Sequence, residues 1–421
     1  MDAPARGRTQ VLSAYPTAVF VTFALSGITW GRPDPAHVLL IAIAAWGMLS
    51  RNLVVEQVVS ITGVSRALGL FLAFYLLSLA FTGWTEGQHL LFTANLLANV
   101  LMACFLASYG TGSDRLALVE RAYVTGALVL SAAAVLSSVG VLQAQPFRPT
   151  LDGRAMPLTG DPNVFASFLV PAFLFTVDGY AQAAAGHERA RFAMATLIAV
   201  GLRLAASRGT WVNLAVAGTI LLVARPSVRA TKVLLGSLLV AFLVVHALLL
   251  LRGSELPGRS ELTDRFVPGS VPAFRFQLYQ YDRDRFRAMA RALPFILRHP
   301  FGTGPGDAIR VTGYGTHNLL LQVATENGMG ALVALLVAIG AIIRACLTSW
   351  RRGVIGAAPS AAAIVAALVG LLVNGMFIDI LYWRILWMLL GLGWAVGILH
   401  SRARQVETSI PVGAPTPVRG G

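Results

Sequence analysis

No Lys, Arg, Asp or Glu interrupts QHLLFTANLLANVLMACFLASYG, residues 88–110 of the chain. A second run without a charged side chain covers residues 11–30. Each run matches the ~20 helical residues needed to cross the ~30 Å hydrocarbon core of a bilayer. Inside lipid the backbone polar groups must be satisfied within the segment itself, so runs of this kind predict membrane-spanning helices.

The overall composition supports the same interpretation. Hydrophobic residues make up 56% of the 421 residues and charged residues only 12%, about half the share usual in soluble domains. The sequence therefore predicts an all-α polytopic membrane protein. We expect about twelve spans, near residues 11–30, 35–50, 66–83, 88–110, 117–143, 162–185, 190–206, 208–224, 231–251, 316–344, 356–379 and 381–400.

The basic residues predict the orientation of the spans, because loops rich in Lys and Arg stay in the cytoplasm. They recur in alternate loops, at Arg51, Arg66, Arg115, Arg121, Arg189, Arg191, Arg225, Arg229, Lys232, Arg344, Arg351, Arg352, Arg402 and Arg404. This pattern places both termini in the cytoplasm. The exception is a long, Arg-rich loop on the outer side, which is long enough to be translocated whatever its charge.

These boundaries divide the chain into four parts. Residues 1–251 hold about nine spans, and residues 252–315 form the extracytoplasmic loop. Residues 316–404 hold about three further spans. Residues 405–421 are rich in Pro, Gly and Val and predict a disordered cytoplasmic tail.

Several classes of function are disfavoured. The net charge of +14 comes from 32 Arg and one Lys scattered over short loops, which argues against a nucleic-acid surface. Cys104 and Cys346 both lie within predicted spans, and no cluster of His, Cys, Asp or Glu has metal-ligand spacing. We therefore expect no nucleic-acid partner, no metal and no cofactor.

The second half of the long loop predicts an amphipathic helix. Phe286, Met289, Leu293 and Ile296 recur at spacings of three and four residues. The basic residues Arg283, Arg287 and Arg291 follow every fourth residue on another face, with Arg285 beside them. Guanidinium groups bind phosphate oxygens in bidentate fashion, so this helix could clamp a diphosphate. The alternative is a helix that rests on the membrane surface with its Arg side chains among the lipid headgroups.

A glycine-rich run and a polar start to a span follow this helix. The run HPFGTGPG, residues 299–306, includes Gly304 and permits close approach of the backbone to a ligand. His317, Asn318, Gln322 and Glu326 then stand at the start of an otherwise apolar span. Polar residues inside a span are costly and usually functional, although a histidine at the boundary is often only interfacial. A neutral imidazole is suited to accept a proton from an attacking hydroxyl.

Further polar residues lie at the ends of other spans. Ser207-Arg208-Gly209 interrupts an apolar hairpin, Asp161-Pro162-Asn163 opens a span after Arg154, and Asp379 follows another span. All of them are predicted on the membrane face that carries the long loop. Residues that only reach from the bilayer to the interface would be spread over both faces.

These motifs resemble the O-antigen ligase and polymerase family of bacterial envelope proteins. The resemblance covers residues 150 to 335, and it is carried by GDPN at 160–163, SRG at 207–209, Arg285 with HPFGTGPG at 299–306, and His317-Asn318 followed by Glu326-Asn327-Gly328. It implies a metal-independent, inverting glycosyltransferase with a C-type fold in the bacterial inner membrane. The donor it implies is an undecaprenyl-diphosphate-linked glycan, and the acceptor a lipid or glycan such as lipid A–core. Membrane lipids are further partners.

Roles follow by position in the motifs. The resemblance implies that Arg208 and Arg285 bind the diphosphate and that His317 acts as the base on, or orients, the acceptor hydroxyl. Arg154, Arg283 and Arg287 are further candidates for the diphosphate. Supporting roles are expected for Asn163, Gly304, Asn318, Glu326 and Asp379.

Three other functions stay open. A polymerase that joins lipid-linked repeat units would carry the same motifs as a ligase. A multi-span transporter would also show many spans and buried Arg, but transporter sites lie at mid-membrane rather than at one face. A scaffold protein of envelope synthesis would leave the outer Arg and His residues unexplained.

Overall fold

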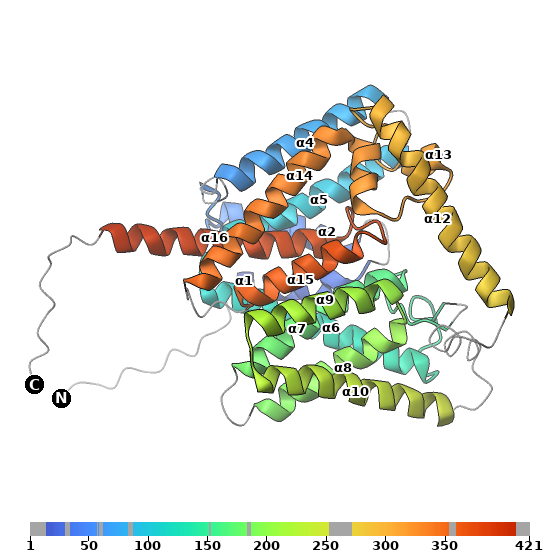
Figure 1. Ribbon diagram of the computed structural model, residues 1–421. Coiled ribbons are helices and arrows are strands. Elements are labelled where there is room, and N and C mark those ends of the chain that lie inside the picture. Colours follow the sequence, from blue (N-terminus) through green and yellow to red (C-terminus); the bar gives the residue numbers. More distant parts are fainter. Residues whose placement is uncertain are drawn as a thin grey trace, which may run out of the picture.

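The computed structural model describes residues 14–29, 34–56, 58, 62–82, 87–150, 153–182, 187–251, 272–352 and 359–409. All regular secondary structure in these ranges is helical (Figure 1). A helix lies at each of the predicted spans: α1 (Ala14–Ala24), α2 (Pro35–Leu49), α4 (Thr62–Thr82), α5 (Gly87–Tyr109), α6 (Ser113–Ser138), α7 (Pro162–Ala181), α8 (Glu188–Ala205), α9 (Arg208–Ala224), α10 (Val228–Leu251), α14 (Leu319–Arg351), α15 (Ala361–Asn374) and α16 (Arg384–Ser409). A short 3-10 turn, η1 (Leu25–Gly27), extends α1.

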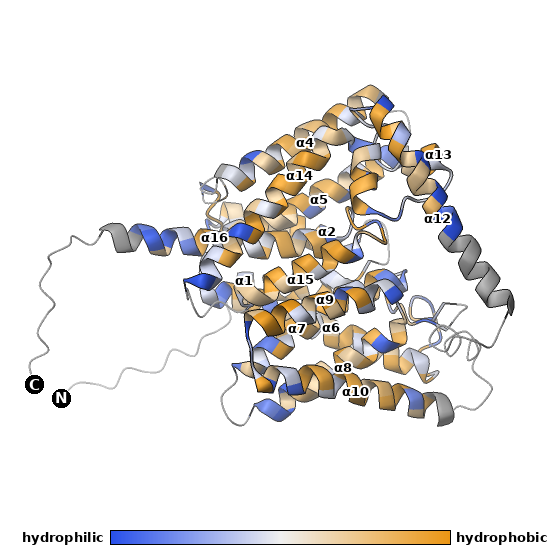
Figure 2. Ribbon diagram, in the orientation of Figure 1, coloured by the Kyte–Doolittle hydropathy of each residue, from blue (hydrophilic) through white to orange (hydrophobic). Residues whose placement is uncertain are grey.

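Seven of the described helices are long and apolar enough to cross a membrane, namely α4, α5, α6, α7, α10, α14 and α16. The apolar helices α1, α2, α9 and α15 are shorter. Most of the ribbon of the bundle helices has the colour of hydrophobic residues (Figure 2). The chain is therefore a multi-pass helical membrane protein. The number of about twelve spans and the outer location of the long loop stay predictions.

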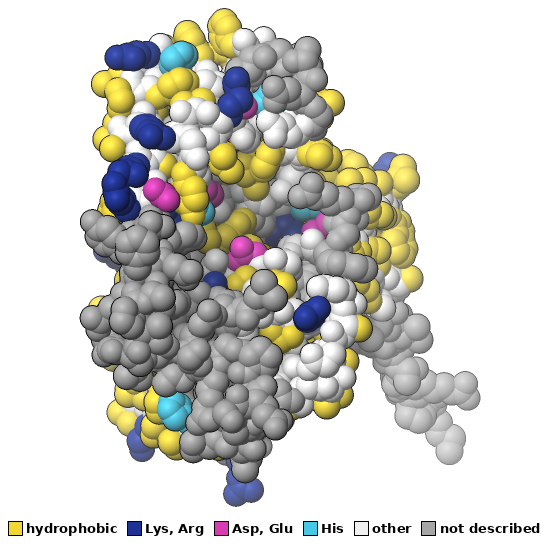
Figure 3. All heavy atoms as spheres, turned by 90° about the vertical axis from the view of Figure 1, so that its right-hand side faces the viewer, with side chains coloured by type: hydrophobic (Ala, Val, Ile, Leu, Met, Phe, Trp, Pro, Cys, Tyr) yellow, Lys and Arg dark blue, Asp and Glu magenta, His cyan; other side chains and the backbone are white. Residues whose placement is uncertain are grey.

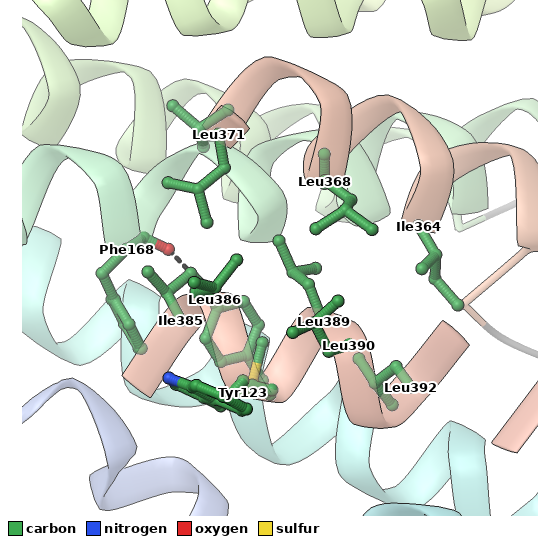
Figure 4. Close-up of a cluster of buried hydrophobic side chains, with 14 of the residues drawn as sticks. Tyr123, Phe168, Ile364, Leu368, Leu371, Ile385, Leu386, Leu389, Leu390 and Leu392 are labelled. Atoms are coloured by element: carbon green, nitrogen blue, oxygen red, sulfur yellow. Dashed lines mark hydrogen bonds between the residues drawn. The ribbon is translucent and has the colours of Figure 1, made fainter. Parts of the chain in front are cut away.

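The centre of the bundle is formed by α7 and α16. In their most apolar stretches, 78% of α7 and 89% of α16 is buried, compared with 28% of α10. Tyr123 of α6 donates a hydrogen bond from its hydroxyl to the carbonyl of Phe168 in α7 within this apolar interior (Figure 4). The helix α16 also continues to Ser409, into the part of the chain predicted to be a disordered tail. The rest of that tail, residues 410–421, lies outside the described residues.

The loop helix exists, but its packed face differs from the expected apolar stripe. α12 (Pro272–Arg298) lies across one end of the bundle, next to α14 and the short helix α13 (Ala308–Thr312) (Figure 1). Ala288, Ala292 and Ile296 are buried, with Ala292 and Ile296 packed on Ala324 of α14. Phe286 is 70% exposed and Leu293 57% exposed. A small side chain allows the two helices to approach closely, so Ala292 forms the contact together with Ile296, in place of Phe286 and Leu293.

Several helices that have polar residues at their first turn begin at the same end of the bundle, which we call the site end. The helices α7, α9, α14 and α16 begin there, and α8 and α15 end there. The α16 start is fastened to the start of α2 by an ion pair, in which Arg384 Nη1 lies 2.9 Å from Asp34 Oδ1. Both side chains are largely buried. Because a buried charge is stable only when paired, this contact anchors α16 at the site end.

Candidate active site

His317 lies just before α14 and faces the connection between α15 and α16. Its Nδ1 atom is 3.9 Å from Oδ2 of Asp379, and about a quarter of each side chain is exposed. The backbone of His317 has a φ of 45°, in the left-handed region that is rare for a residue other than glycine. Such a conformation persists only where the surroundings enforce it.

The charges around His317 act in both directions on its pKa. Partial burial lowers the pKa of His317 from its ordinary value, while the Asp379 carboxylate raises it. Arg285 lowers the pKa and Asp161 raises it, so both lie close enough to His317 for their charges to act on it. Burial raises the pKa of Asp379, and the neighbouring His317 opposes that rise. The net effect keeps the imidazole neutral at neutral pH, which a general base requires.

Asp379 is held in place from the start of α14. Its Oδ1 atom accepts hydrogen bonds from Thr316 Oγ1 at 3.2 Å and from the Asn318 amide at 3.0 Å. Asn318 in turn caps α14, because its Oδ1 accepts from the amides of Leu320 and Leu321 at 3.0 and 3.1 Å. A cap of this kind satisfies amides that have no partner within the helix. Asn318 thus fixes both the helix start and the carboxylate beside His317.

A second cluster of polar side chains connects α7 to the turn between α8 and α9. Asn163 Oδ1 accepts hydrogen bonds from Ser207 Oγ at 2.9 Å and from Arg154 Nη2 at 2.9 Å. Arg154 also donates from Nε to the carbonyl of Ala205 at 3.0 Å. These contacts use two of the donor groups of Arg154 within the protein. Arg154 and Asn163 therefore hold the turn that presents Arg208.

Arg208 begins α9 with an exposed side chain. The next residue, Gly209, lies so close to Asn374 that a Cβ atom there would be 2.5 Å from Asn374 Oδ1. Asn374 ends α15, and Gly375 accepts a hydrogen bond from the Leu319 amide at 2.6 Å. Through this chain of contacts the start of α9 lies beside the segments that carry His317 and Asp379.

The arginines of α12 lie on different faces of the helix. Arg285 is half-buried and shares the face of Ala288 and Ala292, which are three and seven residues further on. Arg283 and Arg287 are exposed on another face, and Arg287 Nη1 lies 3.8 Å from Asp284 of the same helix. The helix period thus directs only Arg285 of these three toward the start of α14.

The glycine-rich run packs along α14. The amides of Thr303 and Gly304 donate to the carbonyls of Thr325 and Glu326 at 3.0 and 2.9 Å. Gly302, Gly304 and Gly306 all have positive φ angles, which glycine adopts readily. The backbone of the run therefore meets α14, rather than standing open to a ligand along its length.

Glu326 is buried within α14 and accepts a hydrogen bond from the Tyr382 hydroxyl at 2.8 Å. Tyr382 and Thr316 were not among the residues expected from the sequence, although both lie in this arrangement. Tyr382 stands between two apolar spans, where an aromatic residue usually indicates only a membrane interface. Only the fold shows that its hydroxyl meets a buried carboxylate.

Seen from the end where α12 lies, the surface is hollowed near its centre, with basic, acidic and histidine side chains around the hollow (Figure 3). Among the described residues, no group of three or more His, Cys, Asp or Glu side chains is placed to hold a metal ion. The arrangement offers one imidazole beside a carboxylate, with Arg285 close enough for its charge to act on the imidazole and Arg208 at the start of α9. Such a site can accept a proton and neutralise a developing negative charge.

Residues 192–336 match the family model described as O-antigen ligase. No curated protein matches the chain. The matched segment includes Arg208, Arg285, His317 and Glu326, whereas Asp379 lies beyond its end. The match confirms the resemblance found in the sequence: the chain carries an O-antigen ligase family domain at residues 192–336, within a multi-pass helical membrane protein.

Proposed function

We propose that the protein is a membrane glycosyltransferase that moves a glycan from undecaprenyl diphosphate to an acceptor hydroxyl, such as one of lipid A–core. The reaction is metal-independent and inverts the anomeric carbon. It takes place at the site end, which faces away from the cytoplasm in the inner membrane of a bacterium.

The observation that carries the proposal is the Asp379 carboxylate beside the imidazole of His317, on which the charge of Arg285 also acts. Asp379 lies at Nδ1 of the imidazole, and the proposal assigns Nε2 to the acceptor hydroxyl. A separation of 3.9 Å is longer than a hydrogen bond, and contacts of this kind tighten when the substrate binds. The family domain at residues 192–336 supports a glycan-transfer enzyme of the ligase or polymerase type.

The proposed step balances as a single displacement. The acceptor oxygen attacks the anomeric carbon from the face opposite the diphosphate, and its proton passes to Nε2 of His317. The bond between the anomeric carbon and the diphosphate oxygen breaks, and the diphosphate leaves with the electron pair. Arg285 and Arg208 bind the leaving group, because a guanidinium meets two phosphate oxygens at once. Asp379 stabilises the imidazolium that forms.

The remaining arginines take a different part in this proposal. Arg154 holds the turn before Arg208, as its hydrogen bonds to Asn163 and Ala205 support. Arg283 and Arg287 lie on the exposed face of α12 and meet lipid headgroups or the glycan.

A polymerase is the second candidate, since it would use the same donor and the same catalytic groups. The two activities differ only in the acceptor. The transporter alternative has less support, because the ionisable residues described above gather at one end of the bundle rather than at mid-membrane.

The test is glycan transfer in detergent by the purified protein. The donor is an undecaprenyl-diphosphate-linked glycan of several repeat units, offered with lipid A–core or with a second donor molecule. We expect transfer in the presence of EDTA. Product on lipid A–core indicates a ligase, and longer lipid-linked chains indicate a polymerase. Loss of transfer with EDTA and its return with Mg²⁺ or Mn²⁺ would show that the proposed mechanism is wrong.

A further inference from the structure

Glu326 occupies a position where a carboxylate is costly. It lies in the third turn of α14, a helix long and apolar enough to span a membrane, and its side chain is 2% exposed. A buried carboxylate is tolerated only when hydrogen bonds compensate for the lost water. Here they come from the Tyr382 hydroxyl, the Gly306 amide and the Gln322 side chain.

The Tyr382 contact fastens the connection between α15 and α16. This connection, residues 375–383, is bound at its start by the Leu319 amide, which donates to the Gly375 carbonyl at 2.6 Å. Asn318 Nδ2 also donates to the carbonyl of Met376 at 3.2 Å. At the other end, Tyr382 donates to Glu326 at 2.8 Å. These hydrogen bonds hold the connection against the first turns of α14.

Asp379 lies between these two attachments. Its carboxylate lies beside His317 and is bound directly by Thr316 and Asn318, while the two attached ends hold the backbone on either side of it. The end at Gly375 and Met376 is held by α14 itself next to Asn318. The other end is held to α14 by the bond from the Tyr382 hydroxyl to Glu326, and to α5 by Asn99 Nδ2, which donates to the Tyr382 carbonyl at 3.0 Å.

Glu326 also holds the glycine-rich run. The carbonyl of Glu326 accepts from the Gly304 amide at 2.9 Å, and its carboxylate accepts from the Gly306 amide. The bond to the Glu326 carbonyl forms where α14 departs from helical geometry at Gly328, with a φ of 85° and a ψ of 167°. One residue therefore binds two segments that approach the site from different parts of the chain.

We propose that Glu326 is a positioning residue that, by holding Tyr382, keeps the 375–383 connection in place and with it Asp379 against His317. The inference rests on the proposed function, in which His317 is the base. Glu326 itself lies two turns inside the helix and does not touch the substrate.

The expected consequence is a change in the titration of His317. The charged groups facing its imidazole are Asp379 from the connection, Asp161 before α7 and Arg285 from α12. Asp379 raises the pKa of His317, and Arg285 lowers it. If Asp379 moves away, the pKa of His317 falls and the acid limb of the transfer rate moves to lower pH. The maximal rate also falls, by about tenfold or more, because the base is misplaced.

The experiment compares Tyr382→Phe with the matched control Tyr123→Phe. Both remove one buried tyrosine hydroxyl, but Tyr123 bonds to Phe168 in the core, away from the site (Figure 4). Transfer rates are measured from pH 4.5 to 8 and normalised to the monodisperse protein. In parallel, the imidazole resonance of ¹³C-labelled His317, assigned with His317→Ala, reports the same titration without any substrate.

Tyr382→Phe should shift the His317 titration in the direction of Asp379→Asn, and Tyr123→Phe should leave it unchanged. Glu326→Leu should act like Tyr382→Phe, because it removes the oxygen that accepts from the Tyr382 hydroxyl. An unshifted titration in Tyr382→Phe, with a clear shift in Asp379→Asn, would show that the inference is wrong and leave the proposed function intact. A wild-type protein that titrates as expected but transfers no glycan would instead refute the proposed function.

Discussion

The chemistry open to His317 depends on which ring nitrogen can meet a substrate. Asp379 lies at the Nδ1 side, 3.9 Å away, and favours the tautomer with its proton on Nδ1. Nε2 is then an acceptor, which suits a base for a hydroxyl. His299 differs, because its ring stacks on Phe295 at 4.0 Å and its Nδ1 meets the Phe295 carbonyl. Two histidines 18 residues apart are therefore assigned different roles.

His317→Ala should abolish glycan transfer while the protein still inserts and accumulates. A general base contributes ~10²–10⁴-fold, so the loss is measurable even in membrane preparations. In the wild type, the rate should stay level at neutral pH and fall only below the ordinary histidine pKa, since partial burial lowers the pKa of His317 and the neutral imidazole is the active form. His299→Ala should retain activity. Near wild-type transfer by His317→Ala between pH 6 and 8 would exclude His317 as the base.

The two arginines Arg285 and Arg287 provide a matched pair on one helix. Arg285→Lys should reduce transfer by ten-fold or more, at about 1.4 kcal/mol per factor of ten, because Lys cannot form a bidentate contact with a diphosphate. Arg287→Lys keeps the exposed charge and should have little effect. Transfer assays with limiting donor measure both variants. Equal losses in the two would point to general attraction of headgroups rather than a defined diphosphate site.

At the scale of elements, the bend in α14 connects the membrane bundle to the site. At Gly328 the helix leaves its regular geometry, and the Met329 amide donates to the Pro300 carbonyl at 3.2 Å instead of to its own helix. The carbonyls of Thr325 and Glu326 then accept amides of the glycine-rich run. The bend therefore lets the glycine-rich run bind to α14. A glycine is needed both in α14 and in the run, because the two backbones lie close together.

Gly328→Ala should destabilise the protein strongly. A Cβ atom at Gly328 would lie 2.3 Å from the Pro300 carbonyl oxygen, and the φ of 85° disfavours any other residue. Backbone strain of this kind costs about 1–3 kcal/mol before the clash is counted. Gly340→Ala is the control in the same helix, because nothing lies within 4 Å of its Cβ position.

The comparison uses thermal unfolding in detergent, followed with a dye that reacts with the buried thiol of Cys346 as it becomes exposed. Gly328→Ala should lower the midpoint and reduce transfer, and Gly340→Ala should leave both unchanged or raise the midpoint. An unaltered midpoint in Gly328→Ala would contradict the role assigned to the bend.

At the scale of the whole molecule, the site depends on bringing distant segments to one end. The chain passes back and forth so that α7, α9, α14 and α16 all begin there. Helix packing supports this arrangement, since α9 packs on α15 and α5 on α16. A helix that reversed direction would carry its polar residues to the opposite end. The proposed glycan transfer therefore requires every span to keep this orientation.

Topology reporters test that arrangement. Fusions at residue 190 should report the cytoplasm, and fusions at residues 260 and 300 should report the opposite side, because loops rich in Arg on the short hairpins are retained inside. A fusion at Lys232 is a further cytoplasmic control. A cytoplasmic signal at residue 300 would place α12 on the wrong side and overturn the proposed site with it.

The sequence by itself determined the class of the molecule. Apolar length and the spacing of Arg are local properties of the chain, and they predicted helices at the positions where the structure has them. The motifs around Arg208 and His317 pointed to the family, and the match at residues 192–336 confirmed that resemblance. Periodicity also predicted the amphipathic helix now described as α12.

Only the tertiary structure decided which residues meet. Arg283, Arg285 and Arg287 follow one another closely in the sequence of α12, and only the packed structure separates them: Arg285 is half-buried, whereas Arg283 and Arg287 are exposed. Tyr382 and Glu326 are 56 residues apart and bond only because two connections fold onto α14. Such contacts depend on packing between helices rather than on local spacing, so the pattern along the chain does not contain them.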